Sequence, residues 1–363
     1  MSQQNRSASI DNIKGVLIFF VVFGHLIEMH IDGDHFLRSI WIFIYSFHMP
    51  MFALVSGMFS KARMEERDNS QLVKSIAVPL IAFELLYETA EFFLHGKLSI
   101  YSGLVAPYWM LWYLLSLLSW RLLLPVFSRL QFPVLSAVVL TMIATYSEHI
   151  GYTLSLSRTL NFLPFFLIGW SMRSDAFNRL PKKLVWLSGL VVALALIASF
   201  LLKTSFDYRW LYGSYSLQRL GMANLTGSMY QVLQYLVSGA IGLAFLHLLV
   251  QRDLGLSNVG KRSMYVFLWH GLALLILQET GIISDIFELE DLPTAALSVG
   301  ISALIVWACS REACENLTQK LILRPFSWLL SKPFGSLVSA ESGNKAVAVD
   351  GKPAAISKAA AVE

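Results

Sequence analysis

A lysine and a histidine in one apolar stretch near the N-terminus have types and spacing that could do chemistry. Lys14 and His25 are eleven residues apart. On an α-helix this spacing comes to about 1100°, or three turns plus about 20°, so both side chains lie on one face. The rise separates them by about 16–17 Å along the axis. A cation at the end of such a helix can hold a phosphate, and a buried histidine above it can take a proton from a hydroxyl. A lysine that reaches for solvent beside a packed, hydrogen-bonded histidine is the alternative that the spacing leaves open.

Two further histidines lie inside apolar stretches. His48 is followed by Pro50, which removes a backbone donor and opens the helix locally, so there is room for a ligand beside the imidazole. His270 comes about two turns after Lys261 and Arg262, so a basic end and a deeper histidine occur together a second time. The candidate catalytic residues are therefore His25, His48 and His270, and the candidate anion-binding residues are Lys14, Lys261 and Arg262. For each histidine, a purely structural role in the core is the alternative.

Acidic and aromatic side chains give a second set of candidates. Glu84, Glu88 and Glu91 follow one another at i, i+4 and i+7, which places them on one stripe of a helix. Such carboxylates could orient a histidine or bind sugar hydroxyls, or they could form a solvated helix end. Trp112 and Tyr113 could stack on a sugar ring, although Trp and Tyr also gather at membrane interfaces for general reasons. We take Glu84, Glu88, Trp112 and Tyr113 as candidate substrate-binding residues.

Membrane-spanning helices must position these side chains. The chain has 363 residues, of which 56% are hydrophobic and 14% charged, whereas soluble domains carry about 25% charged residues. Its apolar stretches reach the length of about 17–25 residues that crosses hydrocarbon, where only helices and closed barrels satisfy the backbone. The sequence therefore predicts an all-α polytopic membrane helix bundle of about ten transmembrane helices. The predicted spans are 14–31, 37–59, 73–94, 106–127, 132–150, 158–172, 184–203, 229–250, 262–282 and 293–310.

The distribution of basic residues predicts the orientation. With the N-terminus inside, the cytoplasmic loops before the tail carry 14 Lys and Arg residues, against six on the opposite side. This asymmetry is typical of the cytoplasmic face, so we expect both termini in the cytoplasm. Residues 1–335 are predicted to form one integral membrane domain. Residues 336–363 are rich in Ala, Lys, Gly and Ser without apolar periodicity, which predicts a disordered cytoplasmic tail.

Several other functions are not supported by the sequence. The formal charge of +4 is spread among loops, so no nucleic-acid partner is expected. Cys309 and Cys314 are the two cysteines; they form no disulfide framework or metal set, and no metal is expected. Residues 255–261 fit most of a phosphate-binding loop, but Arg262 replaces the required Ser or Thr and no strand precedes the segment.

Four short stretches resemble the acyltransferase-3 family of membrane O-acyltransferases, in particular its fucose 4-O-acetylase-like branch. They are Ile10-Asp11-Asn12-Ile13-Lys14-Gly15 with Phe23-Gly24-His25, Ser46-Phe47-His48-Met49-Pro50-Met51-Phe52 with Ser56-Gly57, Asn161-Phe162-Leu163-Pro164-Phe165-Phe166-Leu167-Ile168-Gly169, and Gly260-Lys261-Arg262-Ser263 through Leu268-Trp269-His270. They follow the family order over residues 10–310. Lys14 stands where the family more usually has Arg.

The resemblance implies transfer of an acyl group, usually acetyl, from cytoplasmic acyl-CoA to a sugar hydroxyl of a surface, exported or lipid-linked glycan, in the bacterial cytoplasmic membrane. Lys14 would help to hold the donor, and His25 would be the catalytic base. His48 and His270 match motif histidines. Acetyl-CoA would be a substrate rather than a permanently bound cofactor, and the partners would be acyl-CoA, the glycan and membrane lipid. The alternative function is a transporter or flippase of sugars or glycolipids that uses the same polar groups as a path.

Overall fold

The described part of the chain is built from helices. The computed structural model describes residues 3–32, 35–63, 66–172 and 181–330, and no strand occurs among them. The predicted tail at 336–363 lies outside the described residues. The α-helices are α1 (Gln3–Glu28), α2 (His35–Tyr45), α3 (His48–Met58), α4 (Glu66–Leu72), α5 (Val78–His95), α6 (Ile100–Gly103), α7 (Trp112–Phe127), α8 (Pro133–Ala144), α9 (Leu156–Ser171), α10 (Val185–Leu202), α11 (Arg209–Tyr212), α12 (Leu225–Val250), α13 (Ser257–Lys261), α14 (Ser263–Glu279), α15 (Ile282–Phe287), α16 (Asp291–Cys309), α17 (Glu312–Thr318) and α18 (Arg324–Leu330).

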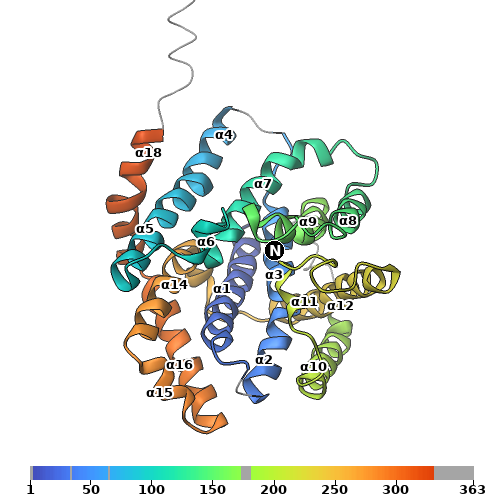
Figure 1. The fold of residues 1–363 in the computed structure, drawn as a ribbon. Coiled ribbons are helices and arrows are strands. Elements are labelled where there is room, and N and C mark those ends of the chain that lie inside the picture. The colour runs from blue at the N-terminus through green and yellow to red at the C-terminus, as the bar shows by residue number, and fades with distance from the viewer. Residues whose placement is uncertain (1–2, 33–34, 64–65, 173–180, 331–363) are drawn as a thin grey trace, which may run out of the picture.

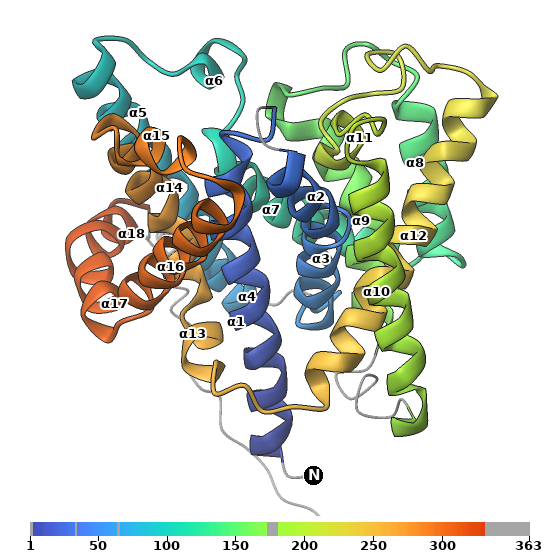
Figure 2. The same ribbon diagram turned by 90° about the horizontal axis from the view of Figure 1, so that it is seen from below.

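Helix α1 lies at the centre of the bundle. In Figures 1 and 2 it separates α14 and α16 from α2, α3 and α9. It packs against α2, α3, α12, α13, α14 and α16. Most of its apolar side chains are buried, including Leu17, Val22 and Ile27 at 0% exposure. Residues on every side of α1 therefore face protein rather than lipid.

Six helical segments are long and apolar enough to cross a membrane. They are Ala8–Glu28, Phe36–Met58, Trp109–Phe127, Lys182–Leu202, Leu225–Val250 and Asp291–Cys309. Only 11% of the α10 window is buried, and its Leu194, Ile197 and Leu201 are exposed. An apolar exposed face of this kind suits contact with lipid, and the chain is a multi-pass membrane protein.

Four of the ten predicted spans form helices that are shorter or more charged than a standard span. α8, α9 and α14 have 12, 16 and 17 residues, and the 73–94 segment is a π-helical turn (Val73–Ala77) followed by the glutamate-bearing α5. α9 is buried along most of its length, so other helices rather than lipid satisfy its surface. The count of ten spans and the cytoplasmic location of the termini stay predictions.

The predicted 37–59 span is broken in its middle. α2 ends at Tyr45 and α3 begins at His48, with Phe47 at φ −140° and ψ −21° between them. His48 Nδ1 donates to the carbonyl oxygen of Ile44 at 2.9 Å, which supplies a donor to a carbonyl at the end of α2. The same oxygen also accepts from the backbone amide of Phe47 at 3.2 Å, so His48 adds a second donor to it. The break therefore leaves this carbonyl paired inside the protein, as hydrocarbon requires.

Glycines allow the helices around α1 to touch backbone to backbone. A Cβ on Gly57 of α3 would lie 1.9 Å from the carbonyl oxygen of Phe166, and one on Gly169 of α9 would lie 1.8 Å from that of Leu54. At the base of α1, a Cβ on Gly260 would lie 1.7 Å from the carbonyl oxygen of Asp11. Small residues at such crossings let membrane helices pack closely. Gly260 of the 255–261 segment thus serves packing against α1, whereas a Cβ on Gly255 would meet nothing within 4 Å.

We predict that Gly57→Ala lowers the thermal midpoint of the detergent-solubilised protein. The new methyl group would force α3 and α9 apart, and overpacking of this kind costs about 1–3 kcal/mol. Gly189→Ala on α10 is the matched control, because a Cβ there meets nothing within 4 Å. It should keep or slightly raise the midpoint, since alanine is favoured over glycine in a helix by about 1 kcal/mol. Equal midpoints for the two variants would contradict the close crossing. Unfolding monitored by size-exclusion chromatography after heating measures both.

Candidate functional site

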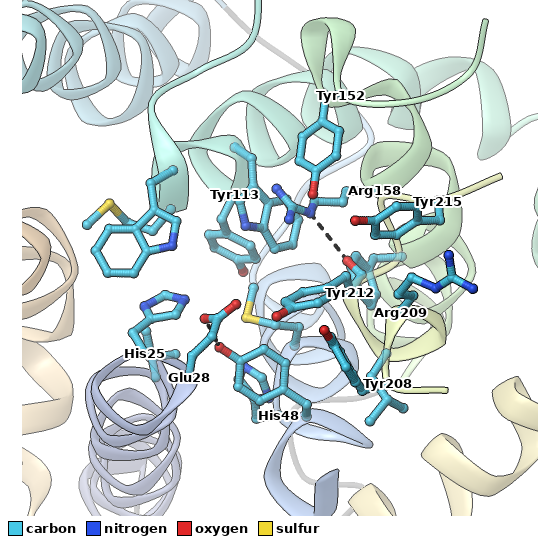
Figure 3. A pocket seen from close by; sticks show the side chains of 18 of the residues that line it. His25, Glu28, His48, Tyr113, Tyr152, Arg158, Tyr208, Arg209, Tyr212 and Tyr215 are labelled. Carbon is cyan, nitrogen blue, oxygen red and sulfur yellow. Dashed lines mark hydrogen bonds between the residues drawn. The ribbon is translucent and has the colours of Figure 1, made fainter. Parts of the chain in front are cut away.

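An aromatic cavity lies beside His25. We call it the aromatic cavity; its volume is about 260 Å³, and Figure 3 shows the side chains around it. Its lining comes from helices α1, α2, α3, α6, α7, α9, α11 and α14 and from the segments between helices. The lining residues are Val21, His25, Glu28, Tyr45, His48, Met49, Tyr101, Trp109, Met110, Trp112, Tyr113, Tyr152, Arg158, Phe162, Tyr208, Arg209, Leu211, Tyr212, Tyr215 and Phe267.

The imidazoles of His25 and His270 form a hydrogen-bonded pair between α1 and α14. His25 Nδ1 lies 3.0 Å from His270 Nε2. On its other side, His270 Nδ1 lies 2.8 Å from the carbonyl oxygen of Phe267 and 3.1 Å from that of Val266. Carbonyl oxygens only accept, so His270 Nδ1 carries the hydrogen. With both rings neutral, His270 Nε2 accepts from His25 Nδ1–H, and the lone pair of His25 remains on Nε2.

The indole of Trp109 and the backbone that carries it complete the wall beside His25. Its ring centroid lies 4.9 Å from that of His25, and its backbone has φ +30°, a value that non-glycine residues rarely adopt. The preceding amide, Tyr108 N–H, donates to both carboxylate oxygens of Glu84 at 2.9 and 3.1 Å. Strained backbone persists where the surroundings hold it in place. Glu84 thus fixes the turn that sets Trp109 against His25.

Glu28 presents a carboxylate to the cavity one turn after His25. The hydroxyl of Tyr45 donates to Glu28 Oε2 at 2.7 Å, and Tyr212 lines the same cavity. The Tyr45 ring is fixed in turn by Trp41, whose ring centroid is 3.8 Å away. In Figure 3 the Glu28 carboxylate lies beside His25 and faces the cavity.

Arg158 of α9 carries a guanidinium to the opposite wall. Its Nε donates to the carbonyl oxygen of Tyr212 at 3.3 Å, as the dashed line in Figure 3 marks. The guanidinium lies 5.0 Å from the ring centroid of Trp112 and 5.3 Å from that of Tyr152. Both distances are within the range of cation–π attraction. The aromatic rings therefore orient a cation toward the cavity.

A second cavity, which we call the basic cavity, lies toward the start of α1. Its volume is about 350 Å³, and its cations come from three elements: Lys14 of α1, Arg121 of α7 and Lys261 of α13. No acidic residue is among its described lining residues. Arg121 is half-buried; its Nη1 donates to Ser60 Oγ at 3.2 Å, and its Nε has no partner. Lys14 Nζ also pairs with Asp11 Oδ1 at 3.4 Å, which offsets part of its charge. The remaining excess of positive charge makes this cavity suited to an anion.

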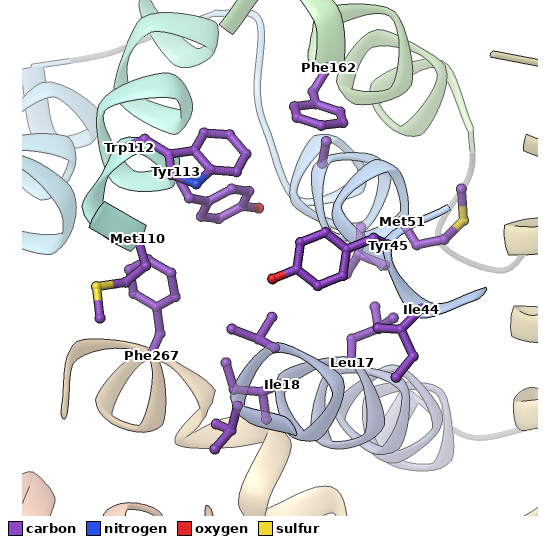
Figure 4. Close-up of a cluster of buried hydrophobic side chains, with 14 of the residues drawn as sticks. Leu17, Ile18, Ile44, Tyr45, Met51, Met110, Trp112, Tyr113, Phe162 and Phe267 are labelled. Atoms are coloured by element: carbon purple, nitrogen blue, oxygen red, sulfur yellow. The ribbon is translucent and has the colours of Figure 1, made fainter. Parts of the chain in front are cut away.

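The two cavities meet in the middle of the bundle. Val21, Met49, Tyr113 and Phe267 line both of them. Tyr113 is held there by its hydroxyl, which hydrogen-bonds Ser56 Oγ at 2.7 Å and donates to the carbonyl oxygen of Phe52 at 3.1 Å. Figure 4 shows Tyr113 and Phe267 facing the apolar side chains of α1. A narrow part of a ligand that passed between these side chains would connect the cations of the basic cavity with His25 in the aromatic cavity.

The structure gathers most of the residues singled out from the sequence around these two cavities. His25, His48, Trp112 and Tyr113 line the aromatic cavity. Tyr113, Lys14 and Lys261 line the basic cavity. His270 is fully buried behind His25.

Besides His270, three predicted site residues lie outside both cavities. Arg262 Nε pairs with Glu315 Oε2 at 2.7 Å and its Nη2 with Glu312 at 4.0 Å. Glu88 accepts hydrogen bonds from the backbone amide and hydroxyl of Ser99. Glu84 holds Tyr108, as described above. The hydrogen bonds of the glutamate stripe thus organise the 99–108 segment, and none of them reaches His25, His48 or His270.

Sequence reasoning assigned no role to Glu28, Arg121 or Arg158. Glu28 carried a usable signal, because a position three residues after His25 shares its helix face. Arg121 carried another, since a cation inside an apolar span usually faces the bundle interior. The signal from Arg158 was ambiguous, because membrane topology alone can explain a basic residue near the end of a predicted helix. Its place in the cavity depends on α9 lying against α7.

We predict that diethyl pyrocarbonate, which acylates an imidazole nitrogen with a free lone pair, modifies His25 faster than His48 or His270. His25 is partly exposed to the aromatic cavity, whereas His48 and His270 are 1% and 0% exposed. Mass spectrometry of peptides from the detergent-solubilised protein measures the order. The exposed His149 serves as the reference for an unhindered rate. Modification of His270 as fast as His25 would contradict the hydrogen-bonded arrangement.

Comparison with known proteins adds to this geometry. Residues 7–311 match the model of the acyltransferase-3 family, described as an acyltransferase domain. Two relatives are similar to part of the chain. Nodulation protein NolL of Sinorhizobium fredii is 33% identical over 182 residues, and that of Mesorhizobium japonicum is 28% identical over 184 residues. Each alignment covers 46% of this chain and 48% of the relative, so the chain spans about half the length of the curated relatives it matches. No solved structure matches. The family model covers most of the chain, and the protein belongs to the acyltransferase-3 family.

Proposed function

We propose that this protein is a membrane-embedded O-acyltransferase that moves an acetyl or other short acyl group from acyl-CoA to a sugar hydroxyl. The observation that carries the proposal is the position of His25. Its Nε2 is free to take a proton, and it lies in the aromatic cavity where that cavity meets the basic one. The family assignment favours acyl transfer over the alternative of a sugar or glycolipid transporter.

The basic cavity supplies a site for the donor. Lys14, Arg121 and Lys261 would face the phosphates of CoA, which are the anionic part of the molecule. Beyond them the wall is apolar, with Ile18, Phe52 and Leu117 among the lining residues. Acyl-CoA has an anionic part that carries the phosphates and a long thin arm that ends in the thioester. The cations of the basic cavity suit the first part, and its apolar wall suits the second. The thioester would then reach the shared residues next to His25.

The aromatic cavity supplies a site for the acceptor. His25 Nε2 takes the proton of the acceptor hydroxyl, and the hydroxyl oxygen attacks the thioester carbonyl carbon. The bond between that carbon and the CoA sulfur breaks, and the thiolate takes the proton back from His25. An alternative is attack by His25 Nε2 itself to form an acyl-histidine, which the hydroxyl oxygen would then resolve. Both routes require the same free nitrogen.

His270 acts as a positioning residue in this proposal. By accepting from His25 Nδ1–H it fixes the tautomer in which Nε2 is basic, and it stabilises the charge when His25 is protonated. The orienting partner of the base is thus an imidazole rather than a glutamate of α5.

We propose that the basic cavity lies on the cytoplasmic side, where acyl-CoA is made. The excess of basic residues on the N-terminal side supports this orientation. The aromatic cavity would then face outward, toward a cell-surface, exported or lipid-linked glycan. We propose the bacterial cytoplasmic membrane as the location and residues 1–335 as the catalytic unit.

We expect His25→Ala to abolish acyl transfer without changing the amount of protein in the membrane. Glycans from cells that carry the intact chain, His25→Ala or no chain are compared by mass spectrometry before and after mild alkali, which removes O-acetyl groups. An alkali-labile acetyl mass found only with the intact chain supports the proposal and identifies the acceptor. Identical glycans from all three, with the protein present in the membrane, would move the assignment to the transporter.

We predict that His270→Gln retains more activity than His270→Ala. The glutamine side-chain oxygen can accept from His25 Nδ1–H, whereas alanine leaves that donor without a partner. Loss of the orienting group should lower kcat by about tenfold or more, because a positioned general base contributes about 10²–10⁴-fold. KM for acetyl-CoA should stay unchanged. Initial rates of CoA release with the identified glycan measure both. Equal losses in the two variants would show that His270 only fills space.

A further inference from the structure

The charged side chains of the aromatic cavity indicate what kind of acceptor it holds. Three charged groups line it: Glu28, Arg158 and Arg209. Arg209 is neutralised by Asp207, with Nε–Oδ1 at 3.0 Å and Nη2–Oδ2 at 2.8 Å. This guanidinium holds the pKa of the Asp207 carboxyl below its ordinary value. The carboxylate of Glu28 and the guanidinium of Arg158 remain for a ligand. Their charges are opposite, so the lining of the cavity favours a ligand without net charge.

Resting on the proposed function, we infer that Glu28 and Arg158 bind the acceptor, and that the acceptor is an uncharged sugar ring with a second hydroxyl next to the one that reacts. Glu28 would accept a hydrogen bond from that second hydroxyl. Arg158 would donate to hydroxyl or ring oxygens from the opposite wall.

Glu28 has the capacity and the position for this bond. An ionised carboxylate offers about four lone-pair sites, and the hydroxyl of Tyr45 accounts for one donor. Its Cα is three residues beyond that of His25, which is a turn of about 300° and a rise of about 4.5 Å. The two side chains therefore face the same ligand, and neighbouring hydroxyls of one ring can reach both.

The carboxylate is not the partner of the catalytic imidazole. His25 Nδ1 is already bonded to His270, and no contact between Glu28 and His25 is among the hydrogen bonds of the described residues. The hydroxyl that donates to the Glu28 carboxylate belongs to Tyr45, so this carboxylate can accept from further hydroxyls.

Arg158 is held so that its outer nitrogens stay available. The rings of Trp112 and Tyr152 and the carbonyl of Tyr212 fix the guanidinium. Among the described residues, no carboxylate lies within ion-pair distance of it and its Nη atoms have no hydrogen-bond partner. An arginine with rings on either side and free Nη donors is suited to oxygen acceptors on a ligand.

The size and the aromatic walls agree with a small ring. Sites for drug-sized ligands have about 300–1,000 Å³, and the volume of about 260 Å³ suits one sugar ring. Trp109 and Trp112 bring apolar faces to it. A larger glycan would enter with its terminal sugar.

The test measures binding and transfer separately on the purified protein in detergent. The probes are the methyl pyranosides of galactose, glucose and mannose, the corresponding methyl uronides, and the corresponding 2-amino sugars. Calorimetry gives Kd for each probe and for acetyl-CoA, and release of free CoA reports transfer. The variants are Glu28→Gln and Arg158→Gln, with Glu288→Gln as the matched control because Glu288 is exposed outside both cavities.

We expect at least one neutral pyranoside to bind about tenfold or more tightly than its uronide and its amino sugar. Glu28→Gln should weaken that binding by about tenfold or more, since hydrogen bonds to charged groups contribute about 1.5–3 kcal/mol. Arg158→Gln should also weaken it, and Glu288→Gln should not. Kd for acetyl-CoA should be unchanged in all three, which a merely unfolded variant could not show.

Three results would overturn the inference. One is unchanged binding of the neutral probes by Glu28→Gln with intact acetyl-CoA binding. Another is a uronide that binds the intact chain more tightly than the neutral pyranosides do and loses that binding in Arg158→Gln. This result would show that the cavity is an anion site. The third is a failure of the intact chain to bind any pyranoside. Sugar binding that depends on Glu28 without release of CoA would instead contradict the proposed acyl transfer.

Discussion

The hydrogen bond between the imidazoles of His25 and His270 joins α1 to α14 at the wall of the aromatic cavity, which His25 lines. Its geometry determines which nitrogen of His25 is free, because His270 is itself committed to two backbone carbonyls. This hydrogen bond forms only when α1 and α14 have a particular separation and a particular rotation about their axes. The close contact between Gly260 and the backbone of Asp11 fixes that separation at the base of α1.

Burial in a membrane restricts how a cavity can be made, because each freed backbone group needs a partner inside the protein. The protein meets this constraint with polar side chains that serve the backbone and the site together. His48 pairs with the Ile44 carbonyl at the break between α2 and α3 while it lines the aromatic cavity. Glu84 pairs with the Tyr108 amide and so fixes the turn that carries Trp109.

The charges divide the site into two regions of different chemistry. Cations from α1, α7 and α13 surround the basic cavity without a lining carboxylate. In the aromatic cavity, Glu28 and Arg158 face each other across a ring of aromatic side chains. An anion and a neutral polar ring would therefore be drawn to different ends, with His25 between them. This separation is what a transfer between two dissimilar substrates requires.

The sequence by itself determined the helical class, the family and the register of α1. Lys14, His25 and Glu28 share a face because the period of a helix is local and depends on no distant contact. The motif histidines were recognisable for the same reason. Composition also predicted a membrane protein, although apolar length could not show that α8, α9 and α14 would be short, since burial among other helices changes the length a helix needs.

Only the tertiary structure decided which side chains meet. His25 and His270 are 245 residues apart, and no local pattern specifies their contact. Lys261 and Arg262 are neighbours in sequence, yet Lys261 lines the basic cavity and Arg262 pairs with Glu315. The chain breaks between α13 and α14 at Arg262, where φ is −103° and ψ is 14°, so the two side chains point to different places. Arg121 and Arg158 reach the cavities because α7 packs against α9 and α9 packs against α3. That packing depends on backbone contacts at Gly57 and Gly169, which a sequence shows only as two small residues.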